Sequence, residues 1–392
     1  MTSRNVAVAD RRGGEGCTTV RQVELYRLEL HRATVHRAAY GTEARRPVVL
    51  VRVTTDVGVG WGECAALASP SYRSEFADGA WMVLERFLVP AVLGMSVPVD
   101  PLPATWRTLA DAWAGVAGHA MAKAALEMAV LDAVLRSQGR SLADALGIGR
   151  ATVEAGVVLG LVEDAGAARE ELEQAAAAGF RRVRVKILAG RSVAPVGQLR
   201  GWFPKLAIAA DANGSYRRDD DAELALLDAL GLAAVEQPLG ADDLLGHVDL
   251  AGRWRTPVAL DESIASPSDV DLVGTLGAAS IVCLKPACLG GVGPAVDAHD
   301  RARRLGLHMW CGGMLQTALG RAVDAAVSGM GGFDMAGDLG GLGRPFVEED
   351  PFGPVPIVDG AVVVHRGPGV GPEPDAGLLG HVVTRHLTIR DR

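Results

Sequence analysis

The sequence predicts an α/β protein in which a closed barrel of strand–helix units follows an α+β domain. Between about residues 152 and 339, short β-branched segments alternate with Ala- and Leu-rich segments whose apolar residues recur at helical spacing. Such alternation predicts parallel βαβ units, and eight of them suit a barrel. An open doubly wound sheet is the alternative, but no GxGxxG motif follows the first strand.

The segment before the barrel, residues 23–150, has a different pattern. LYRLELHRA and RPVVLVRVTTDVGVGWGEC predict antiparallel strands, with a hairpin turn at TTDVG. HAMAKAALEMAVLDAVLRSQG predicts a helix that ends at Gly139. Residues 1–22 are polar and lack the apolar segment of a secretory signal, so we expect a disordered leader.

Residues 151–350 are expected to form the barrel. IVDGAVVVHRGPGVG then predicts a hairpin that turns at Asp359 and Gly360. We expect residues 351–392 to return to the N-terminal domain. The eight predicted barrel strands are VEAGVVLGL, RVRVKI, LAIAADAN, AAVEQP, PVALDES, SIVCLKP, LHMWCGG and FDMAGDL.

Composition excludes several classes of protein. The chain has 392 residues, 49% of them hydrophobic, so a large core is easily built. A formal net charge of −8 disfavours a nucleic-acid partner, and no apolar run is long enough for a membrane span. The five cysteines are scattered without a CxxC pattern, which argues against a disulfide framework or a zinc site. These features predict a cytoplasmic protein.

Ionisable residues follow successive strands at a nearly constant interval of 25, 25, 25 and 24 residues. Because the carboxyl ends of barrel strands meet at one mouth, these side chains should face one another. The residues are Lys186, Asp211, Glu236, Asp261 and Lys285.

Asp211, Glu236 and Asp261 are the candidate metal ligands. Three carboxylates at one mouth repel one another unless a cation neutralises them. Hard oxygen ligands suit Mg²⁺ or Mn²⁺. The alternative is three solvated acids in unrelated loops.

The two lysines are the candidate catalytic bases. Only four of the 39 basic residues are lysines, so a lysine on an apolar strand is notable. Lys186 and Lys285 should lie on opposite sides of the mouth, where an amine could remove a proton α to a metal-bound carboxylate. Arg184 should share a face with Lys186 and lower its pKa, unless it is an ordinary salt-bridged arginine. Asn213 should orient the metal site, unless it only forms a turn.

At these residues the sequence resembles the enolase superfamily, in its muconate lactonising subgroup. RVKI, DANGSY, VEQP, LDES and LKP resemble the lysine and metal-ligand motifs of that subgroup. WGECAALASPSYRSEF, HAMAKAALEMAVLD and WCGGMLQTALGRA are similar to the o-succinylbenzoate synthase and N-acylamino acid racemase family.

This resemblance implies a modified (β/α)7β barrel with an α+β capping domain, and a homo-oligomer. Loops after Leu30 and around residues 65–76 would cover a small carboxylate substrate. The resemblance also implies a site residue at Glu262 and pocket residues at Tyr72 and Trp310.

The chain departs from the family pattern at several positions. The first lysine of Lys-x-Lys is Arg184, and the arginine of Lys-Pro-Gly-Arg-Val-Gly-Gly is Cys288. A first-strand serine is Val158, and a seventh-strand glutamate is Gln316. The eighth-strand pattern Gly-Asp-x-Ser-x-Ser reads GDLGGL. Because the metal and proton machinery is retained, these changes concern the substrate rather than the type of reaction.

The resulting expectation is metal-dependent enediolate chemistry, with dehydration like that of o-succinylbenzoate synthase favoured by Cys288. Lys186 would then be the base and Lys285 a cation over the intermediate. The alternatives are an N-acylamino acid or N-succinylamino acid racemase that uses both lysines, and an epimerase of a dipeptide or natural-product intermediate. Further alternatives are a barrel that only binds a metal and ligand, and a dehydratase that uses His308.

Overall fold

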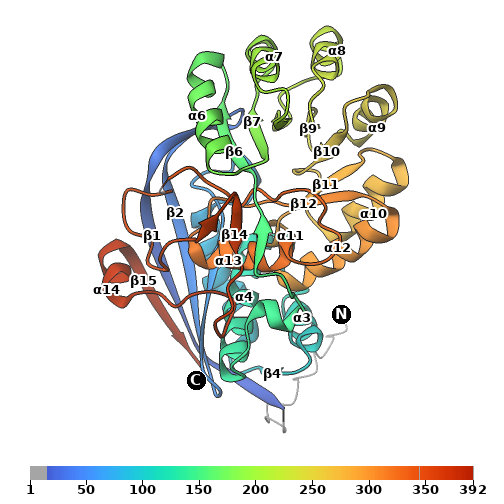
Figure 1. The fold of residues 1–392 in the computed structure, drawn as a ribbon. Helices are drawn as coiled ribbons and strands as arrows, with labels where there is room; N and C mark the ends of the chain where they lie inside the picture. Colours follow the sequence, from blue (N-terminus) through green and yellow to red (C-terminus); the bar gives the residue numbers. More distant parts are fainter. Residues whose placement is uncertain (1–15, 344, 392) are drawn as a thin grey trace.

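The computed structural model describes residues 16–343 and 345–391 (Figure 1). An N-terminal domain packs against a parallel barrel whose helices from α6 (Ala165–Ala177) to α10 (Pro267–Leu276) form the outer rim in this view. The two parts belong to a modified (β/α)7β barrel with an α+β capping domain, as the sequence predicts.

The N-terminal domain is a sheet covered by helices. β1 (Cys17–Ala38), β2 (Gly41–Thr55) and β3 (Val59–Cys64) are antiparallel neighbours, and β4 (Ser96–Pro98) pairs with the start of β1. The predicted hairpin is confirmed, since the Thr55 amide donates to the Gly58 carbonyl at 2.8 Å. The helical elements are α1 (Ala77–Val83), the π-helical turn η1 (Leu84–Leu88), α2 (Val89–Val92), α3 (Leu102–Ala112) and α4 (Ala120–Ser137).

Helix α4 lies directly on strand β3 because two glycines leave room for its backbone. A Cβ at Gly62 would lie 1.9 Å from the Ala125 carbonyl oxygen, and one at Gly60 would lie 2.2 Å from that of Ala129. The helix ends as predicted, with Gly139 in the left-handed region at φ +63°.

The predicted start of the folded part at Val23 is wrong. Strand β1 already begins at Cys17, where it pairs with Pro98 of β4. Thr18, Thr19 and Val20 are all buried there, so this part of the strand belongs to the core and not to a polar leader. Residues 1–15 of the predicted leader lie outside the described residues.

The barrel contains seven parallel strands in sequential spatial order from β6 to β12. The strands are β6 (Val157–Leu161), β7 (Arg182–Lys186), β8 (Ala207–Asp211), β9 (Ala234–Glu236), β10 (Val258–Leu260), β11 (Ile281–Leu284) and β12 (His308–Cys311). The helices are α5 (Leu142–Ala145), α6 (Ala165–Ala177), α7 (Val193–Trp202), α8 (Asp221–Ala229), α9 (Leu244–Arg253), α10 (Pro267–Leu276), α11 (Pro286–Leu289), α12 (Val292–Leu305) and α13 (Ala318–Ser328).

The eighth strand predicted at FDMAGDL is wrong, but this segment closes the barrel. Gly156 donates to the Gly337 carbonyl at 2.6 Å, and Asp338 donates to the Cys311 carbonyl at 2.9 Å. A Cβ at Gly337 would lie 2.8 Å from the Cys311 carbonyl oxygen. The close backbone approach therefore needs glycine, which also weakens a regular strand.

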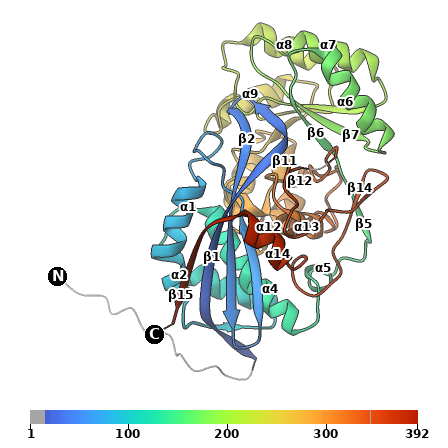
Figure 2. The same cartoon turned by 90° about the vertical axis from the view of Figure 1, so that its left-hand side faces the viewer.

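The C-terminal segment returns to the N-terminal sheet, though not through the predicted hairpin. The hairpin of β13 (Ile357–Val358) and β14 (Ala361–Val363) is confirmed, but it pairs with β5 (Thr152–Glu154). After α14 (Ala376–Val382), strand β15 (Val383–Arg390) pairs antiparallel with β1. Figure 2 shows β15 at the edge of this sheet.

Among the described residues, no helix is long and apolar enough to cross a membrane.

Candidate active site

Strand alternation aims the predicted residues into the barrel mouth. Ala209, Ala234, Ala259 and Cys283 line the interior of the barrel, and the side chain two residues after each of them shares its face. Lys186 pairs in register with Asp211, and Asp211 with Glu236. The structure therefore brings together the two lysines and three carboxylates expected from the 25-residue interval, all of them buried.

On one side of the mouth, the Lys186 Nζ lies 2.5 Å from the Asp211 Oδ2. An Arg184 Nη1 approaches the same oxygen at 3.1 Å and also contacts Glu236. Burial is the largest effect and lowers the pKa of Lys186, as does Arg184, but Asp211, Tyr40 and Glu236 together outweigh them, so this pKa is raised. Arg184 thus lowers the pKa of Lys186, as expected, but the opposing effects of the neighbouring groups are larger. It also reaches Asp338, which sequence reasoning missed, at 3.3 Å.

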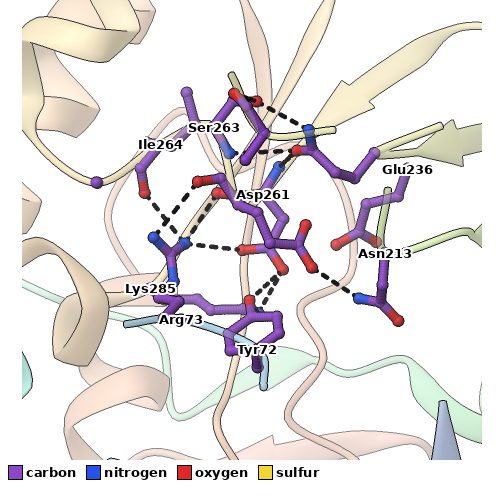
Figure 3. A network of polar contacts seen from close by, with 12 residues as sticks. Tyr72, Arg73, Asn213, Glu236, Asp261, Ser263, Ile264 and Lys285 are labelled. Atoms are coloured by element: carbon purple, nitrogen blue, oxygen red, sulfur yellow. Dashed lines mark hydrogen bonds and ion pairs between the residues drawn. The ribbon is translucent and has the colours of Figure 1, made fainter. Parts of the chain in front are cut away.

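On the other side, a triangle of short contacts holds Lys285 (Figure 3). Its Nζ lies 2.6 Å from the Asp261 Oδ2 and donates to the Tyr72 hydroxyl at 2.7 Å. The Tyr72 hydroxyl donates to the same Asp261 oxygen at 2.7 Å. Burial raises the pKa of Asp261, but Lys285 and Arg73 outweigh it and hold that pKa below its ordinary value.

Two capping-domain tyrosines cover the two lysines. The Lys285 Nζ lies 4.9 Å from the Tyr72 ring centroid, and the Lys186 Nζ lies 6.0 Å from that of Tyr40. Tyr40 follows β1, so the expected loop after Leu30 is mostly a continuation of the β1–β2 hairpin. The sequence did not identify Tyr40 as a site residue. Tyr40 lies far from the barrel residues in the chain, and no motif or spacing connects it with them.

Oxygen donors suited to a divalent cation lie between the lysines. Ligand atoms of Glu236, Asp261 and Cys283 all lie within 4.8 Å of one another. The buried Asp261 Oδ1 has no hydrogen-bond partner among the described residues. Burial raises the pKa of Glu236 well above its ordinary value, and the neighbouring Asp211 and Asp261 add to this shift. A buried carboxylate oxygen without a hydrogen-bond donor and crowded negative charge fit a bound cation.

Asp211 lies outside that compact group because Lys186 and Arg184 pair with its Oδ2. Cys283 lies inside it and was not a candidate, although its position two residues before Lys285 could have indicated it. Hard cations such as Mg²⁺ prefer oxygen, so the carboxylates rather than the thiol are suitable ligands.

Asn213 and Glu262 connect the carboxylates. The Asn213 amide nitrogen donates to the Glu262 Oε1 at 2.8 Å, and its backbone N–H donates to the Asp211 Oδ1 at 3.0 Å. Burial, together with Asp261 and Asp211, raises the pKa of Glu262 to about 7. The Asn213 Oδ1 and the Glu262 Oε2 are buried without a hydrogen-bond partner in the described part of the chain.

Four pocket candidates lie around this centre rather than in it. Trp310 is fully buried in the barrel interior, beneath the ligands, with the Arg182 guanidinium 4.2 Å from its ring. Cys288 packs in the core of the capping domain. Gln316 accepts the Met314 amide at 2.6 Å and lines a small cavity beside α4. Val158 is half-buried in β6 beside Arg184.

His308 is at the wrong end of its strand for catalysis. It begins β12, is exposed and contacts Asp334, whereas the site lies at the carboxyl ends of the strands. The dehydratase alternative that used this histidine is therefore wrong.

The fold and this site define an enzyme of lyase or racemase type. Residues 22–147 match the mandelate racemase and muconate lactonizing enzyme N-terminal domain, and residues 167–378 match the enolase C-terminal domain-like family. The chain belongs to the o-succinylbenzoate synthase and N-acylamino acid racemase family of the enolase superfamily. Enzymes of this superfamily use a divalent metal.

Individual relatives carry both names of the family. The chain is 39% identical to an N-succinylamino acid racemase from Amycolatopsis sp, covering 94% of this chain and 98% of the relative. It is 34% identical to an o-succinylbenzoate synthase from Bacillus subtilis, covering 93% and 97%. A solved structure of a probable mandelate racemase from Alicyclobacillus acidocaldarius is 35% identical, with a TM-score of 0.84 and coverage of 95% and 99%.

Proposed function

We propose that this enzyme removes the proton α to a carboxylate through an enediolate intermediate. The observation that carries the proposal is the pair of buried amines on opposite sides of one carboxylate cluster. Lys186 contacts Asp211 on one side, and Lys285 contacts Asp261 on the other. A substrate carbon between them could lose or gain a proton on either face.

The cluster of Asp211, Glu236 and Asp261 would hold the divalent cation. When bound, this cation supplies the positive charge that acidifies the α-proton and stabilises the enediolate. Lys186 accepts the proton on its face of the substrate. Lys285 provides either a second base or a cation over the intermediate, while Tyr40 and Tyr72 cover the amines and help exclude water.

We propose dehydration of the o-succinylbenzoate synthase type as the main reaction. Cys288 stands in the short helix α11 after Lys285, where the family pattern has an arginine, and this departure supports a smaller role for Lys285 as a base. Racemisation of an N-succinylamino acid is the second candidate, because both amines are buried at the site and a 39% identical relative carries that name.

Proton exchange tests the shared step. The enzyme with Mg²⁺ or Mn²⁺ in D₂O should exchange the α-proton of an N-succinylamino acid, followed by NMR. Exchange that begins from both enantiomers supports racemisation. Formation of o-succinylbenzoate from its dehydration substrate without two-sided exchange supports a dehydratase. Neither exchange nor dehydration across both substrate classes would overturn the proposal.

Three further properties are part of the proposal. We infer Mg²⁺ or Mn²⁺ as the cation, because carboxylate oxygens are hard ligands. We infer a homo-oligomer from the family resemblance and a cytoplasmic location from the composition. The substrate is a small carboxylate in either reaction.

A further inference from the structure

Arg73 connects the capping domain to the end of barrel strand β10. One Arg73 Nη2 donates to the carbonyls of Asp261 at 3.0 Å and Ile264 at 3.3 Å. Its Nη1 donates to the Glu262 carbonyl at 3.4 Å, and its side chain is 14% exposed. Figure 3 shows the guanidinium beside Asp261. A single side chain from residues 65–76 thus holds the backbone that carries a carboxylate of the site.

The same guanidinium lies close to the groups that hold Lys285. It is 5.5 Å from the ring centroid of Tyr72, whose hydroxyl contacts both Lys285 and Asp261. It also lies 3.7 Å from the Asp261 Oδ1. In the part of the chain that the structure describes, Arg73 has no hydrogen bond or ion pair with Lys186. The contacts of Arg73 with Tyr72 and the Asp261 carboxylate therefore lie on the Lys285 side of the site.

The positive charge of Arg73 also acts on a position at which this chain departs from the family pattern. The family pattern has an arginine where this chain has Cys288, in the short helix α11 after Lys285. Cys288 is 2% exposed, and the positive charge of Arg73 acts on its thiol, opposing the effect of burial on the thiol pKa.

We propose that Arg73 is a positioning residue that holds Tyr72 and the Lys285 amine on one face of the substrate. This inference rests on the proposed proton abstraction. It predicts a one-sided defect, because a displacement of a reacting group by about 1 Å can cost about 100-fold in rate. A purely structural role would instead impair both faces.

The test compares α-proton exchange from the two enantiomers of an N-succinylamino acid, in D₂O with Mg²⁺. Lys186→Ala and Lys285→Ala first assign each enantiomer to a lysine. Arg73→Met, which removes the charge, should slow Lys285-dependent exchange by about 10- to 100-fold and Lys186-dependent exchange by less than about threefold. Arg73→Lys should restore part of the loss. Equal losses for both enantiomers, or no loss, would overturn the inference.

Arg366→Ala is the matched control. Arg366 also clamps backbone carbonyls, those of Ile148 at 2.7 Å and Arg150 at 2.5 Å, but away from the site. This variant should leave both exchange rates unchanged.

A readout without substrate separates this inference from the proposed function. Amide hydrogen exchange of residues 65–76 in the metal-free chain should accelerate in Arg73→Met and remain normal in Arg366→Ala. Unchanged protection in Arg73→Met would overturn the clamp. A wild-type enzyme that exchanges no substrate proton would instead overturn the proposed function, and this measurement would still decide whether Arg73 holds the loop.

Discussion

Glu127 links the capping domain to the barrel segment that follows Lys285. This residue of α4 is 2% exposed, and its carboxylate accepts the N–H groups of Val292 at 2.5 Å and Gly293 at 3.0 Å. These are first-turn amides of α12, so a capping-domain acid caps a barrel helix. Gly291 is required there, because a Cβ would lie 1.9 Å from the Glu127 Oε2. We therefore predict that Glu127 makes stability depend on pH.

Burial raises the pKa of Glu127 from 4.5 to about 7, although the two N–H donors oppose the shift. Between these values the folded protein keeps a proton that the unfolded chain has released. The free energy of unfolding must then fall as pH rises, and it levels off above pH 7. The difference in pKa corresponds to about 3 kcal/mol, of which about 2 to 3 kcal/mol falls between pH 5 and 8.

Glu127→Gln removes this titration. At pH 5 the variant should be less stable than the wild type by about 1 to 3 kcal/mol, because one buried N–H loses its acceptor, and this difference should shrink as the pH rises. Its free energy of unfolding should fall by about 2 to 3 kcal/mol less than that of the wild type between pH 5 and 8. Urea unfolding at several pH values measures both quantities. Glu63, whose pKa burial also raises to about 7, is present in both proteins, so its effect cancels.

The exposed Glu170 of α6 provides the control, and Glu170→Gln should keep the pH dependence of the wild type. If Glu127→Gln and the wild type lose the same free energy of unfolding between pH 5 and 8, the carboxyl of Glu127 does not titrate as its burial requires.

Five other outcomes are expected. Removal of divalent metal with EDTA should abolish turnover, and added Mg²⁺ or Mn²⁺ should restore it; full activity without metal would contradict the proposed site. Lys186→Ala should lose about 10²- to 10⁴-fold in rate, and a variant within threefold of wild type would exclude it as the base. In a dehydratase, Lys285→Arg should keep measurable activity, whereas a racemase should lose exchange on one face. Gly62→Ala should destabilise the fold by about 1 to 3 kcal/mol or more, because its Cβ would lie 1.9 Å from the Ala125 carbonyl oxygen, whereas Gly115→Ala meets nothing within 4 Å. Light scattering at micromolar concentration should detect a homo-oligomer, and a strict monomer would count against it.

The sequence alone was sufficient to predict the βα repeat and the convergence of its strand-end residues. Both follow from local periodicity: one strand–helix unit occupies about 25 residues, and strand alternation sets which side chains point inward. Lys186, Asp211 and Glu236 therefore pair in register, as the interval predicted. The rarity of lysine in this chain also pointed to Lys186 and Lys285. Composition is a property of the sequence alone, so this signal needs no tertiary structure.

The tertiary structure decided what joins distant parts of the chain. Closure of the barrel by Gly337, the pairing of β15 with β1 and the contact of Arg73 with Asp261 all depend on three-dimensional proximity. It also decided whether the pKa of Lys186 is raised or lowered. Burial and Arg184 lower this pKa, whereas Asp211, Tyr40 and Glu236 raise it, and only the folded structure sets the balance. Such contacts have no period along the chain, because they arise when separately formed elements pack, and so a single sequence contains no pattern that predicts them.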